Sequence, residues 1–449
     1  MKKQRHPLIV GTFILTATGF ISRLIGFFYR IYLSRLFGEA EMGIYQLLSP
    51  VLSLSFSLTA AGYQTAISKL VAEQTATQKS PSLRPVLQGL SLSLPLSLLC
   101  NAVLYIFADH IALYLLQEPR TASMLRILSF SVPLSAVHSC LNGYFYGIKK
   151  AGIPAGSQLL EQSVRVGCVY IISAYCLSLG KTPSISVAIL GLTIGEFFSM
   201  LMAAIAIFPR LRISSANPIS KLPGSLNKKS GQASLLYGKL LAMALPLTAN
   251  RIVLNLLQSV ESVSIPAQLK IYGYDNTTAL SVYGVLTGMA MPFIFFPNAL
   301  TSSVAVLLLP MISENYALGD MDAVKKATLR TVKYCGFMGI CCMGVFVLLG
   351  RWMGTTLFNS PLAGYFITTL GFLCPFLYLD TTLSSILQGL GMAGHIFAMN
   401  VVCLLLRLGF VFAAIPRFGI TGYLWGLLAS QLALGLLYLG CLYRFLKKH

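Results

Sequence analysis

The chain has 449 residues, of which 56% are hydrophobic and only 10% are charged, and its formal net charge at pH 7 is +20. A soluble globular domain carries about 25% charged residues. The composition therefore excludes a soluble protein and indicates an all-α protein that crosses a membrane many times. The positive charge alone would also fit a nucleic-acid-binding protein, but its distribution along the chain argues against that class.

About twelve apolar stretches follow one another along the sequence. A helix needs about 20 apolar residues to span a bilayer. Basic residues followed by an apolar run at the start would fit a signal peptide, but no small-residue cleavage site follows, and we expect one long first helix that includes Arg23 and Arg30. The predicted spans lie at roughly 8–33, 43–71, 86–108, 122–147, 155–179, 184–208, 237–262, 279–309, 328–350, 361–388, 395–415 and 420–443.

The basic residues are distributed unevenly between the two sides of these spans. With the N-terminus in the cytoplasm, cytoplasmic segments hold 21 of the 33 Lys and Arg residues, outer segments hold seven, and five lie within spans. This asymmetry follows the positive-inside rule. We therefore predict that both termini are cytoplasmic and that the basic segments contact anionic lipid headgroups, and we expect no nucleic-acid partner.

The last two-fifths of the chain repeats the first two-fifths. The offset between the copies changes only in loops, and both copies begin on the cytoplasmic side, so the repeat is parallel. We predict two homologous six-helix bundles around a central cleft, which is the architecture of a transporter. Residues Arg23, Pro133, Gly147, Arg165 and Glu196 correspond to Arg251, Pro375, Gly389, Arg407 and Gln431.

A polar segment rich in Pro, Gly, Ser and basic residues separates the two copies. Such a composition is typical of a linker. We therefore place an N-lobe with helices 1–6 at residues 1–208, a cytoplasmic linker at 209–236 and a C-lobe with helices 7–12 at 237–449.

Arginines within the spans are the most informative residues, because an arginine at the bilayer centre costs about 2.5–3.5 kcal/mol. Arg23 and Arg251 come from equivalent first helices, and neither has an acid one turn away. We predict that they face each other across the cleft and bind the substrate. Asn255 lies one turn after Arg251 on the same polar stripe and joins the predicted site.

Arg30, Arg165 and Arg407 complete the predicted substrate site, and each has a structural alternative. Arg30 can extend to the outer interface. Glu161 and Arg165 are four residues apart on one helix and can neutralise each other. Arg407 has no nearby acid in the sequence, but its equivalence to Arg165 also fits a shared packing role.

A cationic cleft favours an anionic ligand. The planar guanidinium donates two parallel hydrogen bonds to phosphate. A lipid phosphate or pyrophosphate is therefore the natural ligand, and an inside-negative potential would drive its negative charge outward by about 2.3 kcal/mol per charge per 100 mV. The sequence contains no P-loop, so no ATP site is predicted.

Acids within the spans are few, and Glu196, Glu161 and Asp380 are candidates for an ion relay. Helix packing by hydrogen bonds is the alternative for each of them, and we interpret His138 as a satisfied polar residue. The cysteines show no metal-ligand spacing, and no catalytic motif is present. We predict no metal, no cofactor and no enzymatic activity.

Several motifs resemble one known family, in order along nearly the whole chain. The opening SRLIGFFYR at 22–30, LFG at 36–38 and GIY at 43–45 are similar to the first helix and loop of the stage V sporulation protein B family. That family belongs to the multidrug/oligosaccharidyl-lipid/polysaccharide exporter superfamily. Further similar segments are AISKLVAE at 66–73, GYFYG at 143–147, LEQSVR at 160–165, LP at 245–246 with Arg251, and LPMISE at 309–314.

The resemblance implies a flippase in a bacterial plasma membrane. Such a protein moves undecaprenyl-pyrophosphate-linked sugar precursors, similar to lipid II, to the outer leaflet by alternating access, for peptidoglycan or spore cortex synthesis. A cell-wall synthase is a candidate partner. Of the family's cavity arginines it carries over only Arg23, because Tyr29 and the segment 50–53 stand where the lipid II flippases have basic residues.

The sequence leaves three alternatives open. A cation-coupled multidrug antiporter of the same superfamily would have an acid-dominated cleft. A membrane enzyme would need a sizeable outer loop with carboxylates or histidines, and the outer loops near 109–121 and 263–278 are short. A non-transporting partner of a synthase would not need arginines in a cleft. The two-lobe cleft is complete within one chain, so we expect a monomer.

Overall fold

The computed structural model describes residues 7–77, 82–216 and 226–448. Every regular element in these ranges is a helix, which confirms the predicted all-α class. Ten described stretches are long and apolar enough to cross a membrane. One of these, Leu15–Thr75, covers most of the first predicted span and all of the second, and the helix Gly152–Ser178 matches a further one. Each of the twelve predicted spans therefore has a helical counterpart.

The chain forms two compact units. Unit 1 comprises Met1–Gly26 and Leu48–Leu256, and unit 2 comprises Phe27–Leu47 and Leu257–His449. Unit 1 corresponds largely to the predicted N-lobe and unit 2 to the predicted C-lobe. The exceptions are residues 27–47, which belong to unit 2, and residues 237–256, which belong to unit 1. The lobe boundaries at 208 and 237 stay a prediction.

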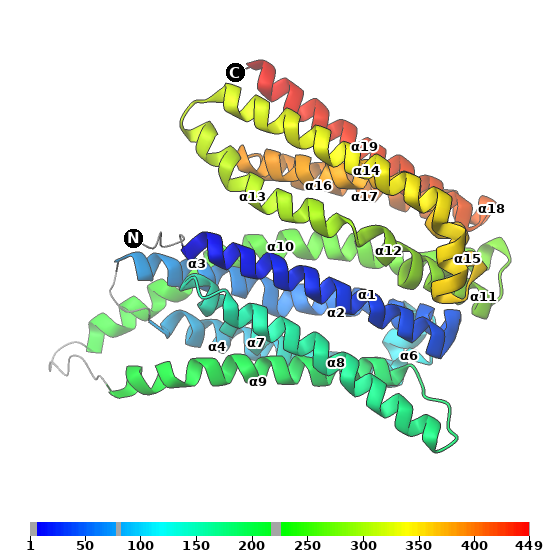
Figure 1. Ribbon diagram of the computed structural model, residues 1–449. Helices are drawn as coiled ribbons and strands as arrows, with labels where there is room; N and C mark the ends of the chain where they lie inside the picture. Colours follow the sequence, from blue (N-terminus) through cyan, green and yellow to red (C-terminus); the bar gives the residue numbers. More distant parts are fainter. Residues whose placement is uncertain (1–6, 78–81, 217–225, 449) are drawn as a thin grey trace, which may run out of the picture. The chain divides into compact units, whose positions relative to one another are not determined.

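Unit 1 contains the first part of α1 and the helices up to the first part of α10 (Figure 1). Helix α7 is central because it packs against α3, α4 and α9, and α8 lies along α9. The elements are α1 (Pro7–Leu47), α2 (Ser49–Phe56), η1 (Ser57–Ala61), α3 (Gly62–Thr77), α4 (Arg84–Ile106), α5 (Ala108–His110), η2 (Ile111–Leu115), α6 (Thr121–Ser129), α7 (Ser131–Gly147), α8 (Gly152–Ser178), α9 (Ser186–Ala216) and α10 (Leu226–Tyr272).

Unit 2 contains the last part of α1, the last part of α10 and all later helices. Helix α16 is central here, packing against α13, α14 and α19, and α17 lies along α19. The further elements are α11 (Asn276–Gly284), η3 (Val285–Ala290), α12 (Met291–Phe295), α13 (Asn298–Ala317), α14 (Met321–Phe358), α15 (Pro361–Leu370), η4 (Gly371–Leu373), α16 (Cys374–Gly389), α17 (Ala393–Ala413), α18 (Ile415–Phe418) and α19 (Ile420–Lys448).

The packing pattern is the same in both units, which confirms two homologous bundles. Helices α3, α4, α7, α8 and α9 of unit 1 pair in the same way as α13, α14, α16, α17 and α19 of unit 2. A glycine that recurs in both units helps to explain the shared packing. Within a membrane, small residues let helices approach closely, and this close packing holds the helices together because lipid supplies no hydrophobic driving force. A Cβ at Gly147 would press on Val71 of α3, and a Cβ at Gly389 would press on Ile312 of α13.

Two predicted connections are largely helical in the structure. The loop expected after the first span is a continuation of α1, interrupted at Gly38, where φ is 80°. A residue with a side chain rarely adopts this left-handed backbone, so glycine permits the kink. Of the predicted linker at 209–236, the described parts belong to α9, which ends at Ala216, and to α10, which begins at Leu226.

Asp275 caps α11 between two spans. Its carboxylate accepts hydrogen bonds from the Thr278 hydroxyl and from the backbone amides of Thr277 and Thr278. The Thr278 hydroxyl is the largest cause of a lowered pKa of Asp275. Because this pKa is lowered by folding, the cap stabilises α11 at pH values above the usual carboxyl pKa, and the stabilisation is lost as pH falls through the lowered value.

We expect Asp275→Ala to expose the first turn of α11. In the variant, hydrogen exchange at the amides of Thr277 and Thr278 should be faster than in wild type at neutral pH, because two amides lose their acceptor. Wild type should approach the variant as the solution is acidified. Equal exchange in both proteins at neutral pH would contradict the cap.

Candidate functional site

The charged side chains predicted within the spans fall into two groups by exposure. Arg23 of α1 and Arg251 of α10 are exposed, whereas the other predicted intramembrane charges are buried or half-buried. Gly19 and Gly26 flank Arg23 on the same face of α1, and a Cβ at either glycine would meet no atom within 4 Å. Arg23 therefore projects from an open, narrow face of its helix. Both arginines lie in stretches that belong to unit 1.

Neither Arg23 nor Arg251 forms an ion pair or hydrogen bond with any residue in the described ranges. Their five donors each are thus available to a ligand. Arg30 lies two turns after Arg23, in the stretch of α1 that belongs to unit 2, and is half-buried with an interaction of its own.

Asn255, one turn after Arg251, has its amide group directed into unit 1. Its Nδ2 donates to the carbonyl of Ser53, at 3.3 Å, and to the Ser57 hydroxyl in η1. The residue therefore fastens α10 to the second helix of unit 1, beside Arg251. Its predicted role in substrate binding stays a prediction.

Arg165 is paired within its own helix. The guanidinium donates to Glu161 one turn earlier on α8, and both side chains are 16% exposed. Helix α9 packs closely beside this pair, because a Cβ at Gly195 would press on the carbonyl of Glu161 and a Cβ at Gly191 would press on the side chain of Val169. The neutralising interaction that the spacing of Glu161 and Arg165 allows is thus present.

Arg407 has a partner that the sequence analysis missed. The guanidinium donates to Glu261 of α10, with 2.6 Å between Nη2 and Oε2, and the Tyr423 hydroxyl of α19 donates to the other carboxylate oxygen at 2.7 Å. Glu261 is 4% exposed. The triad joins three helices of unit 2, and a separation of 146 residues between Arg407 and Glu261 leaves no local signal in the sequence.

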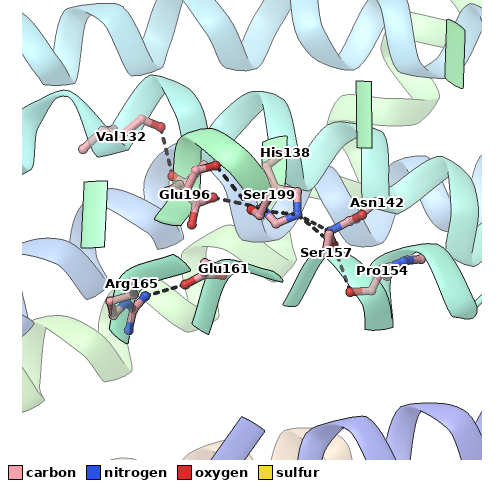
Figure 2. A network of polar contacts seen from close by, with 10 residues as sticks. Val132, His138, Asn142, Pro154, Ser157, Glu161, Arg165, Glu196 and Ser199 are labelled. Atoms are coloured by element: carbon pink, nitrogen blue, oxygen red, sulfur yellow. Dashed lines mark hydrogen bonds and ion pairs between the residues drawn. The ribbon is translucent and has the colours of Figure 1, made fainter. Parts of the chain in front are cut away.

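A second network, in unit 1, surrounds His138 of α7 (Figure 2). The ring Nδ1 lies 2.9 Å from Oε1 of Glu196 and 3.0 Å from the Ser199 hydroxyl, both on α9. On the other side of the ring, Nε2 lies 2.8 Å from Nδ2 of Asn142 and 3.1 Å from the Ser157 hydroxyl of α8. His138 is thus a satisfied polar residue. It also contacts Glu196, a predicted relay acid, and this pairing was not predicted from the sequence.

Asp380 of α16 is the third predicted relay acid, and it is 4% exposed. Its Oδ2 accepts from Nε2 of Gln431, on α19, at 2.6 Å, and its Oδ1 has no donor among the described residues. In the register of the repeat, Asp380 corresponds to His138 and Gln431 to Glu196. The two units therefore hold polar pairs at the same two positions, with the acid on opposite members of the pair.

The described residues contain no group of three or more His, Cys, Asp or Glu side chains that could hold a metal ion. Within the described ranges, most intramembrane charges lie in buried networks inside one unit, whereas Arg23 and Arg251 are exposed and have no partner there. Buried networks can fix helices or carry protons, and exposed guanidinium groups can bind an anion.

Comparison with known sequences shows the family of the chain. The model of a family described as polysaccharide biosynthesis protein matches residues 8–316. Stage V sporulation protein B of Bacillus subtilis (strain 168) is 28% identical over 421 residues, which cover 93% of this chain and 80% of that protein. The lipid II flippase MurJ of the same strain is 22% identical over 358 residues, which cover 76% of this chain and 64% of MurJ.

Solved structures share the fold. A lipid II flippase MurJ in an inward closed conformation aligns with a TM-score of 0.71 and 14% identity, covering 96% of this chain and 87% of MurJ. A multidrug resistance MATE family transporter of the MOP superfamily, in its inward-facing conformation, aligns with a TM-score of 0.69 and 16% identity, covering 95% of this chain and 96% of the transporter. At these identities the likeness concerns the fold alone.

Proposed function

Because the chain belongs to the polysaccharide biosynthesis protein family, we propose that this multi-pass membrane protein is a flippase. Its proposed substrate is a polyprenyl-pyrophosphate-linked sugar similar to lipid II, which it moves from the inner to the outer leaflet by alternating access. The proposed setting is a bacterial plasma membrane with both chain termini in the cytoplasm, and the proposed role is peptidoglycan or spore cortex synthesis. Lipid II is the cargo that the name of one relative states.

One observation carries the proposal: the exposed intramembrane charges are positive. Arg23 and Arg251 are exposed and have no partner among the described residues. The acids of the spans are directed inward, since Glu261 and Asp380 are buried and Glu161 is paired with Arg165. A transporter for cationic drugs would present carboxylates to its cargo, whereas these surfaces present guanidinium groups.

The chemistry of guanidinium explains the choice of pyrophosphate. Each guanidinium can donate two parallel hydrogen bonds to phosphate oxygens. Such charge-assisted hydrogen bonds are about twice as strong as neutral ones. The open face around Arg23, which Gly19 and Gly26 leave free, gives a bulky lipid-linked headgroup room to approach. Outward movement of the anion is then favoured by about 2.3 kcal/mol per charge per 100 mV of inside-negative potential.

The proposal is tested by translocation in proteoliposomes. Purified protein is reconstituted with a fluorescently labelled lipid II-type precursor, an inside-negative potassium diffusion potential is imposed, and the precursor in the outer leaflet is measured by enzymatic cleavage. We expect potential-stimulated translocation of the precursor and none of labelled phosphatidylcholine. Proton- or sodium-driven efflux of a cationic dye, without precursor translocation, would instead identify a cation-coupled antiporter.

A further inference from the structure

His138 lies where three helices of unit 1 meet, and its two ring nitrogens face different partners (Figure 2). On the Nδ1 side are Glu196 and Ser199 of α9, and on the Nε2 side are Asn142 of α7 and Ser157 of α8. The imidazole is about nine-tenths buried, with 10% of its side chain exposed, and Glu196 is 13% exposed. The group is thus enclosed, yet it keeps a narrow access.

The partners of Nε2 include both a donor and an acceptor. Nδ2 of Asn142 donates to Nε2 when the ring is neutral and carries its hydrogen on Nδ1. The Ser157 hydroxyl gives its own hydrogen to the carbonyl of Pro154 at 2.9 Å, so its oxygen is free to accept from an Nε2–H. The neutral imidazole thus accepts from Asn142. The imidazolium is satisfied when Ser157 accepts from Nε2–H and the Asn142 amide turns, because its Oδ1 has no other partner among the described residues.

The charges around the ring indicate that His138 and Glu196 together hold one proton. Glu161 and Arg165 of α8 neutralise each other, which leaves Glu196 with His138 as its nearest basic group. If both lacked the proton, an uncompensated carboxylate would be buried in the membrane, a state that is strongly disfavoured. A single proton on the imidazole or on the carboxyl makes the cluster neutral.

Among the described residues, the charged group in contact with His138 is that of Glu196. Glu161 interacts electrostatically with both His138 and Glu196, and its own ion-pair partner is Arg165. The remaining groups on α3, α4 and α6 are exposed or occupied: Lys69, Glu73, Arg84 and Tyr105 are exposed, Tyr63 lies near Cys140, and Arg126 pairs with Asp109.

The corresponding site in unit 2 has a different charge. There the acid is Asp380, which replaces the histidine, and the partner is the neutral Gln431. With no base in the pair, Asp380 cannot form the ion pair that His138 and Glu196 can form. Of the two equivalent sites, only the one in unit 1 therefore pairs a base with an acid.

We infer that His138 and Glu196 together bind one exchangeable proton and that its uptake and release accompany the transport cycle. Loading forms one N–H or O–H bond with a proton taken from solvent, and unloading breaks that bond and returns the proton. The binding of the proton stands independently, whereas its coupling to transport rests on the proposed flippase function. Ser157 and Asn142 are positioning residues that accommodate the two states of the ring.

The proton site is tested first without transport. Solid-state 15N NMR of histidine-labelled protein in lipid bilayers reports the protonation of each ring, and loss of one signal in His138→Gln assigns His138. We expect acidification to convert the wild-type His138 signal from the neutral to the imidazolium form, because the inferred site binds a proton there. In Glu196→Gln, which copies the amide of unit 2, the imidazolium signal should be absent at pH values where wild type shows it. A wild-type signal that does not change on acidification would overturn the inference.

Coupling is tested in the translocation assay at fixed membrane potential. A transmembrane pH gradient should change the wild-type rate of precursor translocation several-fold, and Glu196→Gln should lose this response. Arg126→Gln, which removes an exposed charge from unit 1, is the matched control and should respond as wild type does. Titration of His138 without any translocation would reject the flippase and keep the proton site. Translocation without a response to the pH gradient would reject the coupling.

Discussion

Replacing Arg23 or Arg251 with alanine is expected to reduce potential-driven translocation of the lipid II-type precursor by roughly 10- to 150-fold. Each charged hydrogen bond to phosphate contributes about 1.5–3 kcal/mol, and about 1.4 kcal/mol corresponds to a factor of ten. Because both side chains are exposed and have no partner among the described residues, their removal should leave the midpoint of thermal unfolding unchanged.

A lysine variant separates the effect of charge from that of hydrogen-bond geometry. Arg23→Lys keeps the positive charge but loses the planar fork, so its rate should lie between those of wild type and Arg23→Ala. Arg417→Ala serves as the control, because Arg417 of α18 is an exposed arginine outside the predicted spans. Full translocation by Arg23→Ala and Arg251→Ala would remove the two arginines from the substrate site.

Replacing Arg407 with methionine is expected to destabilise the protein by about 3–5 kcal/mol, because the buried Glu261 carboxylate would lose its countercharge. Unfolding of purified protein in detergent, followed by its helical circular dichroism signal, measures the loss. The double variant with Glu261→Gln and Arg407→Met should recover much of the stability, since no buried charge would remain.

An exposed ion pair gives the matched control for this prediction. Arg126 donates to Asp109 at 2.6 Å, the same distance as in the Arg407 pair, but the two side chains are 42% and 64% exposed. Exposed pairs contribute about 0–1 kcal/mol, so Arg126→Met should have little effect. If Arg407→Met retained its stability but lost translocation, Arg407 would be a substrate ligand, as the sequence analysis also allowed.

The sequence by itself determined the helices and their repetition. In a bilayer the backbone must form its hydrogen bonds within each span, so runs of about 20 apolar residues specify helices regardless of their neighbours. The same local character revealed the pairing of Glu161 with Arg165, because one helical turn brings the two side chains together. The correspondence of Gly147 and Gly389 likewise predicted equivalent bundles, and each glycine makes the same close contact in its unit.

Only the tertiary structure decided which charges are available to a ligand. Arg165 and Arg407 are equivalent in sequence, yet the first is neutralised by its own helix and the second by Glu261 of another helix. His138 and Glu196 are 58 residues apart, and they meet because α7 and α9 pack face to face. Helical periodicity tells which residues share a face, but which faces meet depends on close packing summed over many small contacts. That packing left Arg23 and Arg251 exposed and enclosed the acids.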